Sequence, residues 1–95
     1  MKRPKSDDGI RIKNQKTGAI FDESCLSCGT GSLLKHEFSV ISGQKYPQED
    51  AYALIFKDET GVEIEYAARI IRVIPPINTV PINRFVFIVP EWDAE

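Results

Sequence analysis

The two cysteines lie three residues apart, in the segment Cys25-Leu26-Ser27-Cys28-Gly29. A Cys-x-x-Cys-Gly turn aims two thiolates at one metal ion, so Cys25 and Cys28 are candidate zinc ligands, with His36 as a third. There is no second cysteine pair, so a four-thiolate site requires two copies of the chain in a dimer. The alternatives are a redox-active pair and two reduced loop cysteines with no role.

Other features that could support catalysis are few. A thioredoxin-type pair sits at a helix N-terminus, which lowers the pKa of the thiol, whereas Gly29-Thr30-Gly31-Ser32 is poor helix-forming sequence. His36 could serve a cysteine nucleophile as base, or it could be an ordinary histidine at the rim of a barrel. No G-x-S-x-G, phosphate-loop or H-E-x-x-H motif accompanies it. We therefore predict a protein that is not an enzyme.

The elements that must position these residues are strands. Runs rich in β-branched and aromatic residues alternate with turns, and no segment has the periodicity of an amphipathic helix. The runs span 10–13, 19–21 (a strand that breaks at Asp22), 33–41, 51–56, 62–73 and 84–89. In the fifth run the alternation slips at Ile70-Ile71, which predicts a β-bulge. The fold class is therefore all-β, a small six-stranded antiparallel barrel.

Composition and charge define one domain with two short flanks. We expect a basic flexible segment at 1–9, a single β-barrel domain at 10–90 and an acidic tail at 91–95. The net charge of −2 gives no reason to expect general nucleic-acid binding. No run approaches the roughly 20 apolar residues of a membrane span, and the first residues lack a signal-peptide core, so we expect a cytoplasmic protein.

Two parts of the sequence resemble a known family. The segment Gly18-Ala19-Ile20-Phe21-Asp22-Glu23-Ser24 looks like the strand that leads into a D-x-S-x-x-G motif. The later segments Ala68-Arg69-Ile70-Ile71-Arg72-Val73 and Phe85-Val86-Phe87 are similar to late strands of the same family, the PilZ domains. The resemblance implies a six-stranded barrel that binds cyclic di-GMP, with Asp22, Ser24 and Gly29 in the ligand loop.

The match to the family motifs is partial. The motif glycine would fall at position 27, where the chain has Ser27, and Gly29 comes two residues later. The family's upstream R-x-x-x-R pair, which the resemblance would assign to phosphate and guanine, is replaced by a basic segment with Arg3 and Lys5. Arg69 and Arg72 are further candidates for a phosphate or partner surface, or they lie on a solvated face. A protein-interaction role is therefore supported as well as messenger binding.

Apolar surface is the last signal. The proline-rich loop at 74–82 and a final strand that is apolar on both faces exceed what one thin core can cover, which favours a protein partner or a homodimer. The sequence thus predicts a non-enzymatic binding or adaptor module that resembles a PilZ domain, with cyclic di-GMP as its implied ligand. The alternative is a small zinc-stabilised interaction domain, and the third hypothesis is a thiol redox protein.

Overall fold

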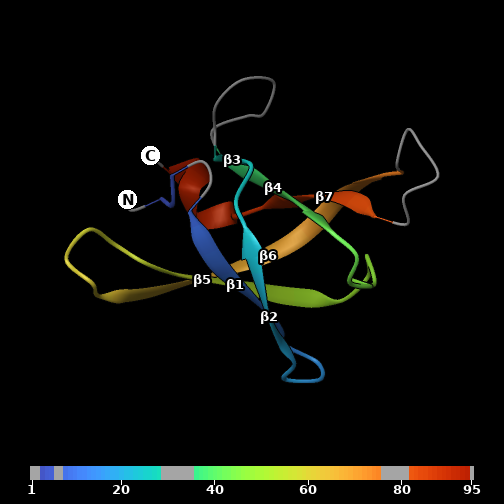
Figure 1. Ribbon diagram of the computed structural model, residues 1–95, viewed down its shortest axis with the longest axis horizontal. Coiled ribbons are helices and arrows are strands. Elements are labelled where there is room, and N and C mark those ends of the chain that lie inside the picture. The colour runs from blue at the N-terminus through green and yellow to red at the C-terminus, as the bar shows by residue number, and fades with distance from the viewer. Residues whose placement is uncertain (1–2, 6–7, 29–35, 76–81, 95) are drawn as a thin grey trace.

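The computed structural model describes residues 3–5, 8–28, 36–75 and 82–94. Within them the chain forms seven strands and one short 3₁₀ helix (Figure 1). These elements are β1 (Gly9–Asn14), β2 (Ile20–Ser24), β3 (Ser27–Cys28), β4 (Glu37–Ser42), β5 (Ala51–Lys57), β6 (Glu63–Ile74), β7 (Asn83–Ile88) and η1 (Pro90–Ala94). The strands pair antiparallel, and these described residues contain no α-helix, which confirms the all-β class.

The sheet is curled into a half-barrel and is not closed, so the predicted six-stranded antiparallel barrel is confirmed only in part. Its strand order is β2-β1-β5-β6-β7-β4-β3, which leaves β2 and β3 at the two ends. The cysteine segment explains this arrangement. The Cys25 N–H donates to the Asp8 carbonyl, on the β1 side, and the next residue, Leu26, donates to Ser39 of β4. The chain therefore passes from β2, at one end of the strand order, to β3, at the other end. As a result, among the described residues β2 pairs only with β1, and β3 pairs only with β4.

The expected runs at 10–13, 51–56, 62–73 and 84–89 correspond to β1, β5, β6 and β7. The second run continues as β2 to Ser24, beyond the break expected at Asp22. The third expected run lies partly outside the described residues, and β4 begins at Glu37. The predicted bulge is confirmed, because the β6–β7 register shifts between Ile70 and Arg72.

Two hairpins set the positions of the functional candidates. The β1–β2 turn contains Gly18 and the β5–β6 turn contains Gly61, with φ angles of 78° and 84°. A side chain is strained at such angles, so glycine allows each chain reversal. The Asp58 carboxylate also accepts hydrogen bonds from the Thr60 and Val62 N–H groups, which fixes the shape of the β5–β6 turn.

Aromatic rings fill the inside of the curl. The rings of Phe38 and Phe87 stack at a centroid distance of 4.9 Å, on paired positions of β4 and β7. Tyr46, from the β4–β5 loop, packs edge-on against Phe85 and Tyr52. Alternate residues of the strands point into this core, as the sequence pattern indicated.

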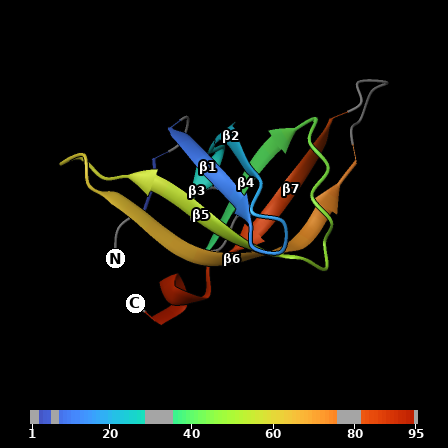
Figure 2. The ribbon, with the colours of Figure 1, turned by 90° about the horizontal axis from the view of Figure 1, so that it is seen from below.

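The C-terminal residues form η1 and pack against the sheet. Trp92 in η1 is fully buried and its ring lies edge-on to Phe38 and Tyr66. The Arg3 guanidinium sits 5.1 Å from the centre of the Trp92 ring. Figure 2 shows η1 beyond the end of β7 and close to the N-terminal segment. Both flanks expected from the sequence, at 1–9 and 91–95, thus contribute contacts to the fold.

Candidate functional site

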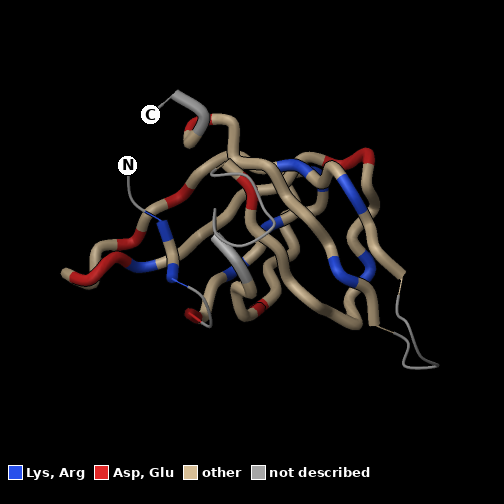
Figure 3. Tube along the Cα trace, turned by 90° about the horizontal axis from the view of Figure 1, so that it is seen from above, with Lys and Arg blue, Asp and Glu red and all other residues tan. Residues whose placement is uncertain are grey.

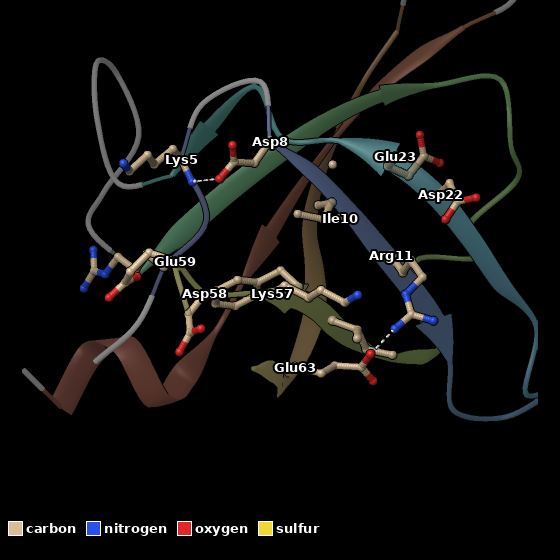
Figure 4. A pocket seen from close by; sticks show the side chains of 14 residues that line it. Lys5, Asp8, Ile10, Arg11, Asp22, Glu23, Lys57, Asp58, Glu59 and Glu63 are labelled. Atoms are coloured by element: carbon tan, nitrogen blue, oxygen red, sulfur yellow. Dashed lines mark hydrogen bonds and ion pairs between the residues drawn. The ribbon is translucent and has the colours of Figure 1, made fainter. Parts of the chain in front are cut away.

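A hollow of about 780 Å³ lies on the outer face of the sheet, beside the N-terminal segment (Figure 4). We call it the N-terminal hollow. It is bordered by the N-terminal segment, β1, β2 and the β5–β6 hairpin. Its charged lining residues are Arg3, Lys5, Asp8, Arg11, Asp22, Glu23, Lys57, Asp58, Glu59 and Glu63. Three residues singled out from the sequence, Arg3, Lys5 and Asp22, are therefore brought together.

The β1–β2 hairpin positions one side of this hollow. Its antiparallel register places Arg11 directly opposite Asp22, and paired residues of a ladder point to the same face. Lys5 is held nearby by a turn in which its backbone N–H donates to the Asp8 carboxylate at 2.9 Å. This local turn fixes the backbone of the basic segment at one side of the hollow, and Asp22 lies at the other side (Figure 4).

The opposite wall comes from the β5–β6 hairpin. Glu63 accepts a hydrogen bond from the Arg11 guanidinium at 2.6 Å, although both side chains are substantially exposed to solvent. Such a pair adds little to stability because water screens it, at roughly 0–1 kcal/mol. Its structural effect is to orient Arg11 across the floor of the hollow, as the dashed line in Figure 4 indicates.

The charge of the hollow is mixed. Six carboxylates and four cationic side chains line it. Asp8, Asp58 and Glu63 accept hydrogen bonds from neighbouring protein groups. The Glu23 carboxylate likewise accepts a 2.7 Å bond from Ser42 and a second bond from Tyr46. A bare polyanion is therefore a poor fit, whereas a ligand that carries both anionic groups and hydrogen-bond donors suits the lining.

The Glu23 contacts also join the edge of β2 to the end of β4. The Tyr46 hydroxyl is buried and donates to Glu23, and burial, followed by this bond and the Glu23 charge, raises the pKa of Tyr46 above its ordinary value. Phe21 of β2 packs edge-on against the same tyrosine ring. Strand β2, which lines the hollow, is therefore held in place by contacts with Ser42 and Tyr46.

The other candidate ligand residues lie elsewhere. Ser24 ends β2 and is exposed, but it is not among the residues that line the hollow. Gly29 lies outside the described residues. Arg69 lines a second, more open hollow beside Glu49 and Asp50. Arg72 is directed to the buried Glu37 carboxylate at 3.6 Å. The structure therefore does not place Arg69 or Arg72 with Asp22.

The candidate metal ligands are not assembled into a site in the described part of the chain. Cys25 is fully buried and is disulfide-bonded, and the sequence has only one other cysteine, Cys28, whose side chain lies outside the described residues. His36 precedes β4, and its carbonyl accepts the Val89 N–H. No cluster of three His, Cys, Asp or Glu side chains suited to a metal occurs among the described residues. A disulfide has no thiolate to offer zinc, so the zinc hypothesis stays a prediction for the reduced protein.

Arg11, Lys57 and Glu63 were missed by the sequence analysis as site residues. Arg11 carried a usable signal, because counting back from the turn at Gly18 pairs it with Asp22. Glu63 carried none, since it meets Arg11 only through the intervening strand β5. The pairing of non-adjacent strands depends on the whole sheet and not on local spacing.

Comparisons of the chain with protein-family models, with curated proteins and with solved structures found no match. In the described residues, no helix combines the length and the apolar character that a membrane crossing requires.

Proposed function

We propose that the protein is a non-enzymatic binding module that takes a cyclic dinucleotide of the cyclic di-GMP type in the N-terminal hollow. The observation that carries this proposal is the convergence of Arg3, Lys5, Arg11 and Asp22 on one hollow. Its volume of about 780 Å³ lies within the range typical of small-molecule sites, roughly 300–1,000 Å³.

The chemistry of the ligand follows from the two signs of charge. Phosphate oxygens accept hydrogen bonds from guanidinium and ammonium groups, which Arg3, Lys5 and Arg11 supply. The edge of a guanine base offers adjacent N–H donors, which a carboxylate such as Asp22 accepts. Because Asp22 and Arg11 are paired across β1 and β2, a ligand with a base and a phosphate close together can meet both.

The balance of charge separates this ligand from simpler anions. Carboxylates outnumber cations in the hollow, so electrostatic attraction alone does not favour a phosphate ion. Binding must instead come from matched donors and acceptors on a single ligand. We therefore expect cyclic di-GMP to bind and inorganic phosphate to bind at least ten-fold more weakly, a difference of about 1.4 kcal/mol or more.

Isothermal titration calorimetry with cyclic di-GMP, and with inorganic phosphate for comparison, tests the proposal. Asp22→Asn and Arg11→Ala should each weaken cyclic di-GMP binding about ten-fold or more. The matched control is Lys13→Ala, since Lys13 lies on the same face of β1 as Arg11 but does not line the hollow. Absence of binding at high micromolar ligand, or equal losses in the control, would overturn the proposal.

A further inference from the structure

A second feature of the outer surface lies on the other half of the sheet. There, Ile41 of β4 pairs with Arg84 of β7, and Arg84 in turn pairs with Ile74 of β6. These residues form one row across three strands and point to one face. Ile41 is 48% exposed and Ile74 is 41% exposed, and Ile82 lies close to Gly43 at the end of β4. Together with Arg72, they form what we call the isoleucine–arginine patch: Ile41, Arg72, Ile74, Ile82 and Arg84.

The two arginines of the patch are held by the sheet. The Arg84 Nε donates to the buried Ser39 hydroxyl at 3.3 Å, and Arg72 lies 3.6 Å from the Glu37 carboxylate. Glu37 is buried, whereas the side chain of Arg72 is 51% exposed. The surface that reaches solvent is therefore apolar and positively charged, and the compensating carboxylate lies beneath it.

The opposite end of the molecule presents an apolar side chain and negative charge, which complement the isoleucine–arginine patch. The β5–β6 hairpin tip, residues 57–65, contains four carboxylates and one lysine. Val62 at this tip is 58% exposed, more than any other large hydrophobic residue in the described part of the chain. The tip is also preformed, because Asp58 accepts hydrogen bonds from its own turn. It presents an apolar side chain between acidic groups on a fixed backbone.

The tip and the patch cannot meet within one molecule. Strand β6 runs from Glu63 at the tip to Ile74 in the patch, and twelve extended residues span roughly 40 Å. The longest extent of the molecule is 39 Å. Figure 3 shows acidic residues on the hairpin at one end of the molecule and several basic residues at the other end, where a short acidic segment also lies.

We propose that the β5–β6 hairpin tip of one copy docks on the isoleucine–arginine patch of a second copy. Val62 meets the exposed isoleucines, and the hairpin carboxylates meet Arg72 and Arg84. The two surfaces are different, so the contact is head-to-tail, and each added copy leaves one free tip and one free patch. A single hairpin covers less than the roughly 1,000 Å² of a stable interface, so association is weak, dependent on concentration and reduced by salt.

The residues that test this contact are not among those assigned to ligand binding. Several residues of the hairpin also line the N-terminal hollow, but Val62 and Glu65 do not. Ile74 and Ile41 likewise lie outside the hollow. Substitutions at these positions therefore change self-association without removing a residue assigned to ligand binding.

Sedimentation velocity over a range of protein concentrations tests the contact. The wild-type protein should show a rising average mass at low salt, and this rise should disappear at about 0.5 M salt. The patch variant Ile74→Glu and the tip variant Val62→Ser with Glu65→Lys should each associate at least ten-fold more weakly. The control is Ile20→Glu, because Ile20 on β2 has the same 48% exposure as Ile41 but lies outside the patch.

Mixing the two deficient variants gives the sharper result. The intact tip of the patch variant should dock on the intact patch of the tip variant, which yields a dimer that does not grow further. A wild-type protein that stays monomeric at about 1 mM would overturn the proposal. So would a control that associates as weakly as the patch variant, or a mixture that stays monomeric while the wild type associates. The salt dependence of the wild type provides a readout that requires no variant to fold.

Discussion

Two aromatic side chains close the opposite ends of the curled sheet by different physical means. Trp92 follows β7 and Tyr46 follows β4, and these strands are antiparallel, so the two rings lie at opposite ends of the core. Both rings are almost completely buried. The Trp92 Nε1 finds no hydrogen-bond partner among the described residues, whereas the Tyr46 hydroxyl donates to Glu23.

The difference shows what each end of the sheet requires. At the Trp92 end, the ring packs edge-on against Phe38 and Tyr66 and makes no hydrogen bond among the described residues, so apolar packing closes the core. At the Tyr46 end, β2 and β4 meet without a ladder of paired residues in the described part of the chain, and the hydrogen bonds of Glu23 join them. One end therefore depends on buried area, and the other depends on a charge held by two hydroxyl groups.

Trp92→Ala should produce the largest loss of stability. It removes a fully buried ring that contacts Phe38 and Tyr66, and such truncations cost about 3–5 kcal/mol. Urea denaturation followed by circular dichroism measures the change. Trp92→Phe keeps an aromatic ring in the core but leaves a cavity where the larger indole was, and the N–H that it removes has no partner among the described residues, so we expect a loss of roughly 1–2 kcal/mol. Equal losses in the two variants would show that Trp92 is not held mainly by packing.

Tyr46→Phe should have a smaller effect, because the ring and its packing remain. The variant loses the hydrogen bond to Glu23, and hydrogen bonds to charged acceptors contribute about 1.5–3 kcal/mol. Tyr66→Phe is the matched control, since no hydrogen bond to the Tyr66 hydroxyl is seen among the described residues. We expect that control to change the free energy of unfolding by less than about 0.5 kcal/mol. If both variants lose the same amount, the hydroxyl of Tyr46 does not hold β2 to β4.

The sequence predicted the parts of this fold that depend on local residue pattern. Runs rich in β-branched and aromatic residues identified β1, β5, β6 and β7, and the adjacent Ile70 and Ile71 identified the bulge. Whether the sheet closes into a barrel could not be predicted from the local residue pattern. Closure depends on which neighbour Cys25 and Leu26 bond to, and local spacing carries no information on that choice.

The candidate site shows the same limit. Asp22, Arg3 and Lys5 were found through composition and a family resemblance, and the hollow contains all three. Arg69 and Arg72 also matched the resemblance, yet β6 directs them to other surfaces. Trp92 was assigned to a tail because the residues around it are acidic, and its burial depends on a core formed by distant strands.

Alkaline pH should affect the free energy of unfolding through the tyrosine end of the core and not through the Trp92 end, and this is the smallest effect that we expect. Burial, and then the charges of Asp50 and Glu49, raise the pKa of Tyr52 to about 12, and Tyr46 is shifted in the same direction. The unfolded chain loses a tyrosine proton near pH 10, so the folded state binds more protons between pH 10 and 12. The contribution of Tyr52 to stability is therefore fully present below pH 10 and falls as the pH rises, by about 1 kcal/mol at pH 11 for Tyr52 alone.

Tyr52→Phe should reduce the slope of the free energy of unfolding against pH. Trp92→Phe should unfold at lower denaturant but with the wild-type slope, because an indole does not titrate in this range. A Trp92→Phe slope that differs from the wild type would mean that the two ends of the core are coupled and do not close independently.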